Sequence, residues 1–166
     1  MQAFFRVLIE EVDSSLVQEW ESLVHPGAAR ARKDAQPRAY DLALDERGLR
    51  ARLRAESHRL LHALSIRDWD EAARCLRPDP ANPWDPARLR AALGPFFSEH
   101  SALRFDHRAR LAEFIAIRRQ AARQWSVTQR LLDPDEQSDW YFEAEVDLRG
   151  VSEPEGPLLR LVRIAS

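Results

Sequence analysis

The segment WSVTQRLLDPDEQSDWYFEAEVDL, residues 125–148, decides the fold because it holds two alternating runs on either side of a turn rich in aspartate. Apolar side chains occupy every second position of each run, which is the period of a β-strand with one buried face. If the runs pair antiparallel with Leu131 opposite Trp140, a single register sorts both strands into an apolar and a polar face. The segment therefore predicts a β-hairpin.

The polar face of this hairpin carries three acids at alternate positions, Glu143, Glu145 and Asp147. Such a row could be a set of catalytic carboxylates or the solvated face of a sheet. The predicted register places Thr128 opposite Glu143 and Ser126 opposite Glu145. Hydroxyl neighbours on a solvated face give no reason for a raised carboxyl pKa, so we interpret the acids as the wet side of the sheet.

Gln129 breaks the pattern, because it is a polar residue on the apolar side, opposite Phe142. A buried amide needs hydrogen-bond partners. Gln129 is therefore the residue of the hairpin whose hydrogen-bond partners should be identified first.

Helical spacing dominates the chain before the hairpin. We expect an N-terminal helical segment over residues 1–24, a linker or long loop over 25–41, and an α+β domain over 42–166. Within that domain the pattern predicts helices over about 45–66 and 68–76 and a third that begins at Pro86. Asp68 and Asp85 are expected to cap the second and third helices.

The third helix should bend or end at Gly94-Pro95, because proline lacks an N–H and clashes with the preceding turn. Residues 111–117 suit a strand or a helix, and we prefer a strand. A last strand follows the turn at 152–157. The predicted class is α+β, with N-terminal helices packed on a C-terminal curved antiparallel sheet.

The charge composition of the chain limits the ways in which it could bind nucleic acid. The 166 residues carry 25 basic and 27 acidic side chains, so the net charge of −2 gives no chain-wide attraction to nucleic acid. Local arginines could still contact phosphates. The alternative is that they lie on a solvated face, with acids nearby, and bind nothing. The candidate nucleic-acid contacts are Arg30, Arg32, Lys33, Arg118, Arg119 and Arg123.

Motifs for common chemistries are absent from the sequence. It contains no G-x-x-x-x-G-K-[ST] loop, no Gly-rich dinucleotide turn, no G-x-S-x-G and no H-E-x-x-H. Cys75 is the single cysteine, and we interpret it as a small buried side chain. His58 and His62 lie four residues apart without a nearby third ligand, so we interpret them as boundary histidines. The sequence thus indicates no metal and no cofactor.

A polar loop offers the alternative of a pocket. His100, Asp106 and His107 could supply a base with an orienting carboxylate, and Gln129 could join them. A helix end followed by a turn would explain the same residues without any chemistry. The first residues, MQAFFRVLIEEVD, lack the basic start and cleavage site of a signal peptide, and acids interrupt their apolar run. We therefore expect a cytoplasmic protein without a membrane partner.

Four segments together carry a family resemblance: residues 12–23, 84–100, 105–110 and 125–148. They resemble the C-terminal region of a bacterial family of DEAD/DEAH-box helicases, a domain of unknown function appended to two ATPase domains. The most specific element is the W-x-V-x-Q-x-L run from Trp125 to Leu131, followed by Asp133-Pro134 and Asp139-Trp140.

The resemblance implies a non-catalytic accessory domain that assists an ATP-driven motor. Its partners would be the helicase ATPase domains of the same parent protein or of a neighbour, together with RNA or DNA. It implies no catalytic residue, and the ATPase motifs themselves are absent from the 166 residues.

A second, looser resemblance is one of shape. Helices followed by a curved antiparallel sheet look like the cone-shaped nuclear-transport-factor-two-like fold. Because that fold hosts pockets and enzymes as well as other functions, a small-molecule-binding domain or an enzyme is the alternative expectation.

Overall fold

Three α-helices precede a four-stranded sheet in the described part of the chain, residues 41–166 of a computed structural model. The helices are α3 (Glu46–Ser65), α4 (Trp69–Arg74) and α5 (Pro86–Glu99). A short 3₁₀ helix, η1 (Ala112–Phe114), leads into β1 (Ile115–Ala121), β2 (Gln124–Arg130), β3 (Tyr141–Asp147) and β4 (Arg160–Ala165). The predicted α+β class is confirmed, while the predictions for residues 1–24 and 25–40 lie outside the described residues.

The strands form an antiparallel meander in the order β1-β2-β3-β4. The register predicted for the central hairpin is confirmed, since Val127 lies opposite Ala144 and the Leu131 N–H donates to the Trp140 carbonyl at 2.8 Å. The strand preferred near residue 115 is also present, preceded by η1.

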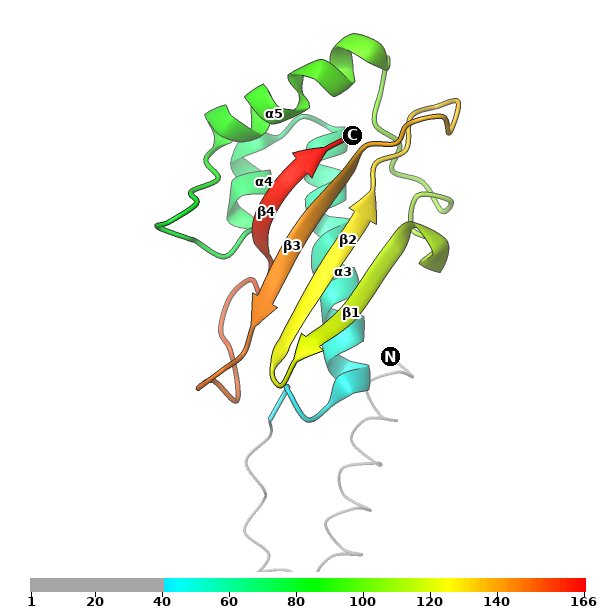
Figure 1. The fold of residues 1–166 in the computed structure, drawn as a ribbon. Helices are drawn as coiled ribbons and strands as arrows, with labels where there is room; N and C mark the ends of the chain where they lie inside the picture. Colours follow the sequence, from blue (N-terminus) through cyan, green and yellow to red (C-terminus); the bar gives the residue numbers. More distant parts are fainter. Residues whose placement is uncertain (1–40) are drawn as a thin grey trace, which may run out of the picture. The chain divides into compact units, whose positions relative to one another are not determined.

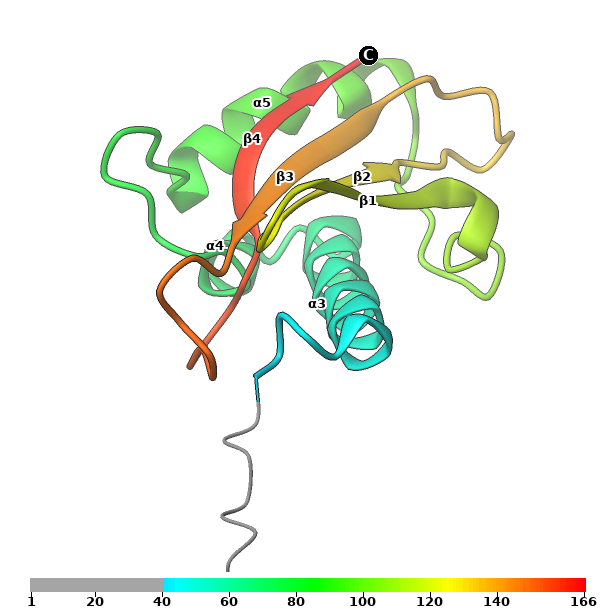
Figure 2. The same ribbon diagram turned by 60° about the horizontal axis from the view of Figure 1, so that its bottom comes forward.

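The helices lie on one face of the curved sheet, and no described element covers the other face (Figures 1 and 2). Helix α3 packs on the β1 side and α5 on the β4 side, with α4 between them. Every second residue of β2 and β3 turns inward to meet the helices, and these side chains are buried. The largest fully buried side chains on the helices are Leu49, Leu53, Leu60, Leu61, Leu64, Leu89, Leu93 and Phe96.

Aspartates cap all three helices, and the two predicted caps are among them. The carboxylates of Asp45, Asp68 and Asp85 each accept the N–H of the residue three positions on, at 2.9, 2.9 and 2.7 Å. Pro86 follows the last cap as the first helical residue.

The helix does not end at Gly94-Pro95, contrary to one of the two outcomes predicted, because α5 continues to Glu99. Leu93 and Phe96 are fully buried, whereas Gly94 and Pro95 face solvent. On the solvent side the carbonyl one turn before the proline can tilt outward and be hydrated. The burial of the two flanking apolar residues is thus enough to hold the helix through the proline.

Polar groups from elsewhere in the chain cover both edge strands. Arg50 of α3 donates to the Ile117 carbonyl of β1 at 2.9 Å. On the other side, the Arg77 N–H donates to the carbonyl of Leu159, just before β4, at 2.8 Å, and the Asn82 amide donates to the Leu161 carbonyl of β4 at 3.2 Å. These contacts occupy carbonyls that would otherwise pair with another strand.

Candidate functional site

The β1 edge of the sheet gathers basic side chains from three parts of the chain. On β1 itself, Arg118 lies opposite Ser126 on the uncovered face and Arg119 lies opposite buried Trp125 on the helix-facing side. Both arginines are exposed. The edge strand therefore presents a guanidinium group on each side of the sheet.

Helix α3 adds a basic stripe beside this strand. Arg47, Arg50, Arg54 and His58 follow one another at three- or four-residue steps and so share one side of the helix. The contact between Arg50 and the Ile117 carbonyl places this side of the helix next to β1. Arg50 also pairs with Glu46 at 2.9 Å, whereas Arg47 and Arg54 are exposed and make no such ion pair within residues 41–166.

The loop before η1 is the third part of the chain that supplies a basic side chain, Arg110. The Phe105 ring lies 4.8 Å from the His62 ring, and the Arg110 guanidinium lies over Phe105 at 5.6 Å. This stacking sets Arg110 beside the last turns of α3.

His58 lies near two of these side chains, Arg54 of the same helix and Arg110 of the loop. Burial lowers its pKa, and the positive charges of Arg110 and Arg54 lower it further. Its Nε2 atom is shielded from solvent and has no hydrogen-bond partner among the described residues. We define Arg54, His58, Arg110, Arg118 and Arg119 as the β1-edge cluster, a set of basic side chains along one edge of the fold whose positive charge would favour an anion.

Arg123 was predicted with Arg118 and Arg119, but its guanidinium group is engaged within the fold. It donates to the carbonyls of Leu148 and Val151 at 3.1 Å each and pairs with Asp41. These contacts hold the β1–β2 turn against the turn after β3. The predicted residues Arg30, Arg32 and Lys33 lie outside the described residues.

The predicted pocket residues separate into two polar groups that share the loop between β2 and β3. In the first group, His100 Nδ1 lies 3.5 Å from Asp133 Oδ2. Burial alone would raise the pKa of Asp133, but the backbone N–H groups of Ser138, Asp135 and Gln137 outweigh this effect and lower it. Asp133 is thus the acceptor that shapes the turn between the two strands.

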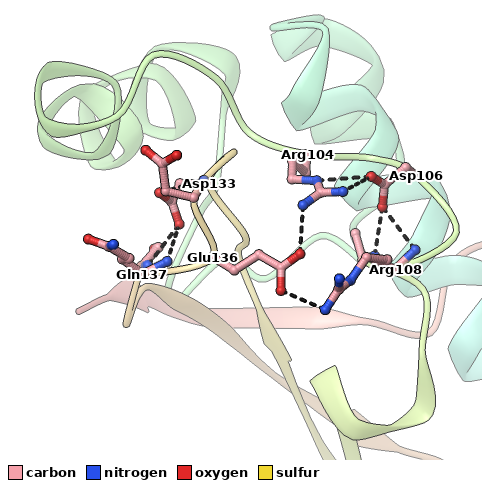
Figure 3. Close-up of polar contacts among 9 residues, drawn as sticks. Arg104, Asp106, Arg108, Asp133, Glu136 and Gln137 are labelled. Carbon is pink, nitrogen blue, oxygen red and sulfur yellow. Dashed lines mark hydrogen bonds and ion pairs between the residues drawn. The ribbon is translucent and has the colours of Figure 1, made fainter.

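The second group is an ion-pair network between two loops (Figure 3). Arg104 pairs with Asp106 and with Glu136, the latter at 2.7 Å, and Arg108 pairs with Glu136 at 2.8 Å. The hydrogen bond from Arg104 and the N–H groups of Ala109 and Arg108 lower the pKa of Asp106 to about 2. A carboxyl group with this pKa is a poor general base, so the network is suited to joining the loops.

The remaining two predicted pocket residues do not join either group. His107 is exposed. Gln129 is fully buried and donates from Nε2 to the Arg130 carbonyl at 3.1 Å and to the Ala109 carbonyl at 3.4 Å, while its Oε1 atom has no partner among the described residues. The structure therefore does not bring His100, Asp106, His107 and Gln129 together around one reacting centre.

The candidate contacts chosen from the sequence did not include three members of the β1-edge cluster, namely Arg54, His58 and Arg110. The steps from Arg47 to His58 were visible as a helical stripe, but a stripe of cations on a helix is usually just solvated. The meaning of this stripe depends on the position of β1 and of the loop carrying Arg110, which the sequence pattern does not supply.

Over residues 41–166, no helix combines the length and the apolar character that crossing a membrane requires. A comparison with curated proteins and one with solved structures each find no match. The comparison with protein families finds a match over residues 1–164 to the model described as Domain of unknown function (DUF3516). Because the match spans almost the whole chain, the protein belongs to the DUF3516 family.

Proposed function

We propose that this protein is a non-catalytic accessory domain that works with ATP-driven helicase domains and holds nucleic acid by its phosphate backbone. The helicase part of the proposal rests on the sequence resemblance at residues 84–100 and 125–148. The nucleic-acid part rests on the β1-edge cluster.

The convergence around His58 is the observation that supports phosphate binding best. The charges that lower the pKa of His58 come from Arg110 and Arg54, and no carboxylate is among them. A phosphate oxygen in this place would accept hydrogen bonds from cations whose mutual repulsion is otherwise uncompensated. Arg119, on the helix-facing side of β1, would extend the contact along the edge, and Arg118 would add a contact from the uncovered face.

The charge of the whole chain suits a positioning role better than tight binding. With a net charge of −2, attraction to nucleic acid would arise only at a local surface. A few phosphate contacts give modest, strongly salt-dependent and sequence-independent affinity. Such affinity would let an accessory domain guide a strand while the motor moves along it.

Binding of labelled single- and double-stranded RNA and DNA of equal length across a salt series tests the proposal. Affinity should be highest at low salt, and the logarithm of the binding constant should fall linearly with the logarithm of the salt concentration. Absence of binding to all four ligands at the lowest salt would overturn the nucleic-acid part.

Two matched variants locate the surface. The double variant Arg54→Gln with Arg110→Gln should weaken binding to every sequence and reduce the salt slope by about one for each phosphate that the protein no longer neutralises. The control is Arg90→Gln on α5, an exposed arginine on the β4 side of the fold. Equal weakening in both variants would show that binding does not depend on the β1-edge cluster.

A further inference from the structure

Two aromatic rings adjoin the β1-edge cluster near the end of α3. His62 follows His58 by one helical turn, about 6 Å further along the helix axis. Because Arg54, His58 and His62 are spaced four residues apart, they share one side of the helix. The centre of the His62 ring lies 4.8 Å from that of the Phe105 ring, with the two planes tilted by 56°. The cations and the ring pair therefore follow one another along α3.

The two rings differ in their exposure. Phe105 is partly buried and packs against the hydrophobic core, whereas His62 is exposed. The core thus holds Phe105, and Phe105 in turn supports the imidazole ring without enclosing it. Leu111, which is 43 % exposed, adds an apolar side chain on the loop that carries Phe105. An exposed ring on a regular helix is a surface on which a nucleic-acid base can stack.

Arg110 places a positive charge beside this ring pair. Its guanidinium group lies 5.6 Å from the centre of the Phe105 ring, and its Nε atom donates to the main-chain carbonyl of Asp106 at 3.3 Å. Within residues 41–166 the Arg110 side chain makes no ion pair, and the Asp106 carboxylate is engaged by Arg104 instead. A phosphate next to the rings would therefore find an unpaired cation.

We infer that the β1-edge cluster holds an unpaired nucleic-acid strand and that one base of this strand stacks on His62. The inference rests on the proposed nucleic-acid function and adds to it the form of the ligand and a residue that contacts a base. Cations alone would hold the phosphates of a duplex or of a single strand. The exposed ring favours the single strand, because the bases of a duplex are already stacked on one another.

Four labelled probes of equal length separate base stacking from phosphate contact: oligothymidylate, oligouridylate, a DNA strand made of abasic sites, and a DNA duplex. The abasic strand has the phosphates of oligothymidylate without its bases. Fluorescence anisotropy at low salt should show at least one of the two oligonucleotides binding roughly fivefold more tightly than the abasic strand, which is the lower end for stacking of one base. A preference between the two identifies DNA or RNA as the source of the strand.

The duplex arm opposes the expectation from charge alone. A duplex carries twice as many phosphates as a single strand of the same length, so binding through phosphates alone would favour it. The duplex should nevertheless bind more weakly than the better of the two single strands, because it offers no free base to His62.

Variants at His62 locate the stacking. His62→Ala removes the ring and should weaken binding of the single strand roughly fivefold, while binding of the abasic strand stays unchanged and reports that the fold and the cations are intact. His62→Phe keeps an aromatic ring and should restore the affinity. The control is Leu44→Ala, because Leu44 is an exposed apolar residue that precedes the other end of α3. This variant should bind like the natural protein.

The outcomes distinguish this inference from the proposed function. If the abasic strand binds as tightly as both oligonucleotides, or if His62→Ala keeps the full affinity for the single strand, stacking is excluded while phosphate binding stands. Tighter binding of the duplex than of either single strand also overturns the inference. If none of the four probes binds at the lowest salt, the nucleic-acid function itself fails, and the inference fails with it.

Discussion

Arg50 of α3 donates from Nη1 to the main-chain carbonyl of Ile117 at 2.9 Å, so a helix side chain occupies the middle of edge strand β1. The same guanidinium group is held by Glu46 at 2.9 Å. An unprotected edge strand presents a row of backbone groups to any other strand. Arg50 thereby joins the helix layer to the sheet and also blocks pairing at the centre of the edge.

Replacement of Arg50 with methionine should reduce the free energy of unfolding by about 1 kcal/mol, because the Ile117 carbonyl is left without its partner. It should also increase self-association at high concentration, since the edge becomes open. Urea denaturation and light scattering measure the two effects. Arg47→Met, one turn earlier on α3, is the matched control, and equal behaviour of the two variants would contradict the role of Arg50.

Gln129 offers a sharper test of the core. Its amide donates to two carbonyls while Oε1 has no partner among the described residues. Gln129→Glu replaces the donor with a buried carboxylate that faces carbonyl oxygens and should destabilise the fold by about 3 kcal/mol. Gln129→Met keeps the volume without a charge and should cost only about 1 kcal/mol. Urea denaturation compares the two, and a Glu variant as stable as the Met variant would show that Gln129 has access to water.

Patterns local in sequence predicted the fold better than they predicted the site. The register from Trp125 to Val146 follows from alternation within one hairpin, so the residues themselves contain the information. The aspartate caps are local in the same way. The continuation of α5 through Pro95 depends instead on the burial of Leu93 and Phe96. Helix propensity does not take such tertiary packing into account.

The site depends on contacts between distant segments. The sequence suggested that His100, Asp106 and His107 could supply a base with an orienting carboxylate, but the structure pairs His100 with Asp133 and Asp106 with Arg104. The loop between β2 and β3 brings Asp133 to His100, and no periodicity marks that approach.

Arg123 combines a strained backbone with a set of long-range hydrogen bonds. Its φ of 63° lies in the left-handed region, which costs a non-glycine residue roughly 1 kcal/mol. Arg123→Ala keeps this strain and removes the bonds to Leu148, Val151 and Asp41, so it should destabilise the fold by about 2 kcal/mol. Arg123→Gly removes the same bonds but relieves the strain.

The expected order of stability is therefore the natural protein first, then Arg123→Gly, then Arg123→Ala, with about 1 kcal/mol between the two variants. Thermal and urea denaturation both measure it. An alanine variant as stable as the glycine variant would mean that the turn relaxes out of the left-handed region once the guanidinium group is gone.

Protonation of Asp106 should destabilise the fold over a defined range of acidic pH. The hydrogen bond from Arg104 is the main cause that lowers its pKa from 3.8 to about 2. Because the folded-state pKa lies below the unfolded value, the ionised carboxylate contributes stability above pH 3.8. That contribution disappears as the pH falls from 3.8 to about 2, since the folded protein must then take up the proton as well.

Asp106→Asn should therefore be less stable than the natural protein at pH 7, and the difference should shrink as the pH falls through this window. Urea denaturation followed by tryptophan fluorescence at several pH values gives the comparison. Glu155→Gln, at an exposed position of the turn before β4, is the control and should follow the natural protein throughout. If Asp106→Asn keeps a constant difference down to about pH 2, the ion pair with Arg104 does not set the acid response of the two loops.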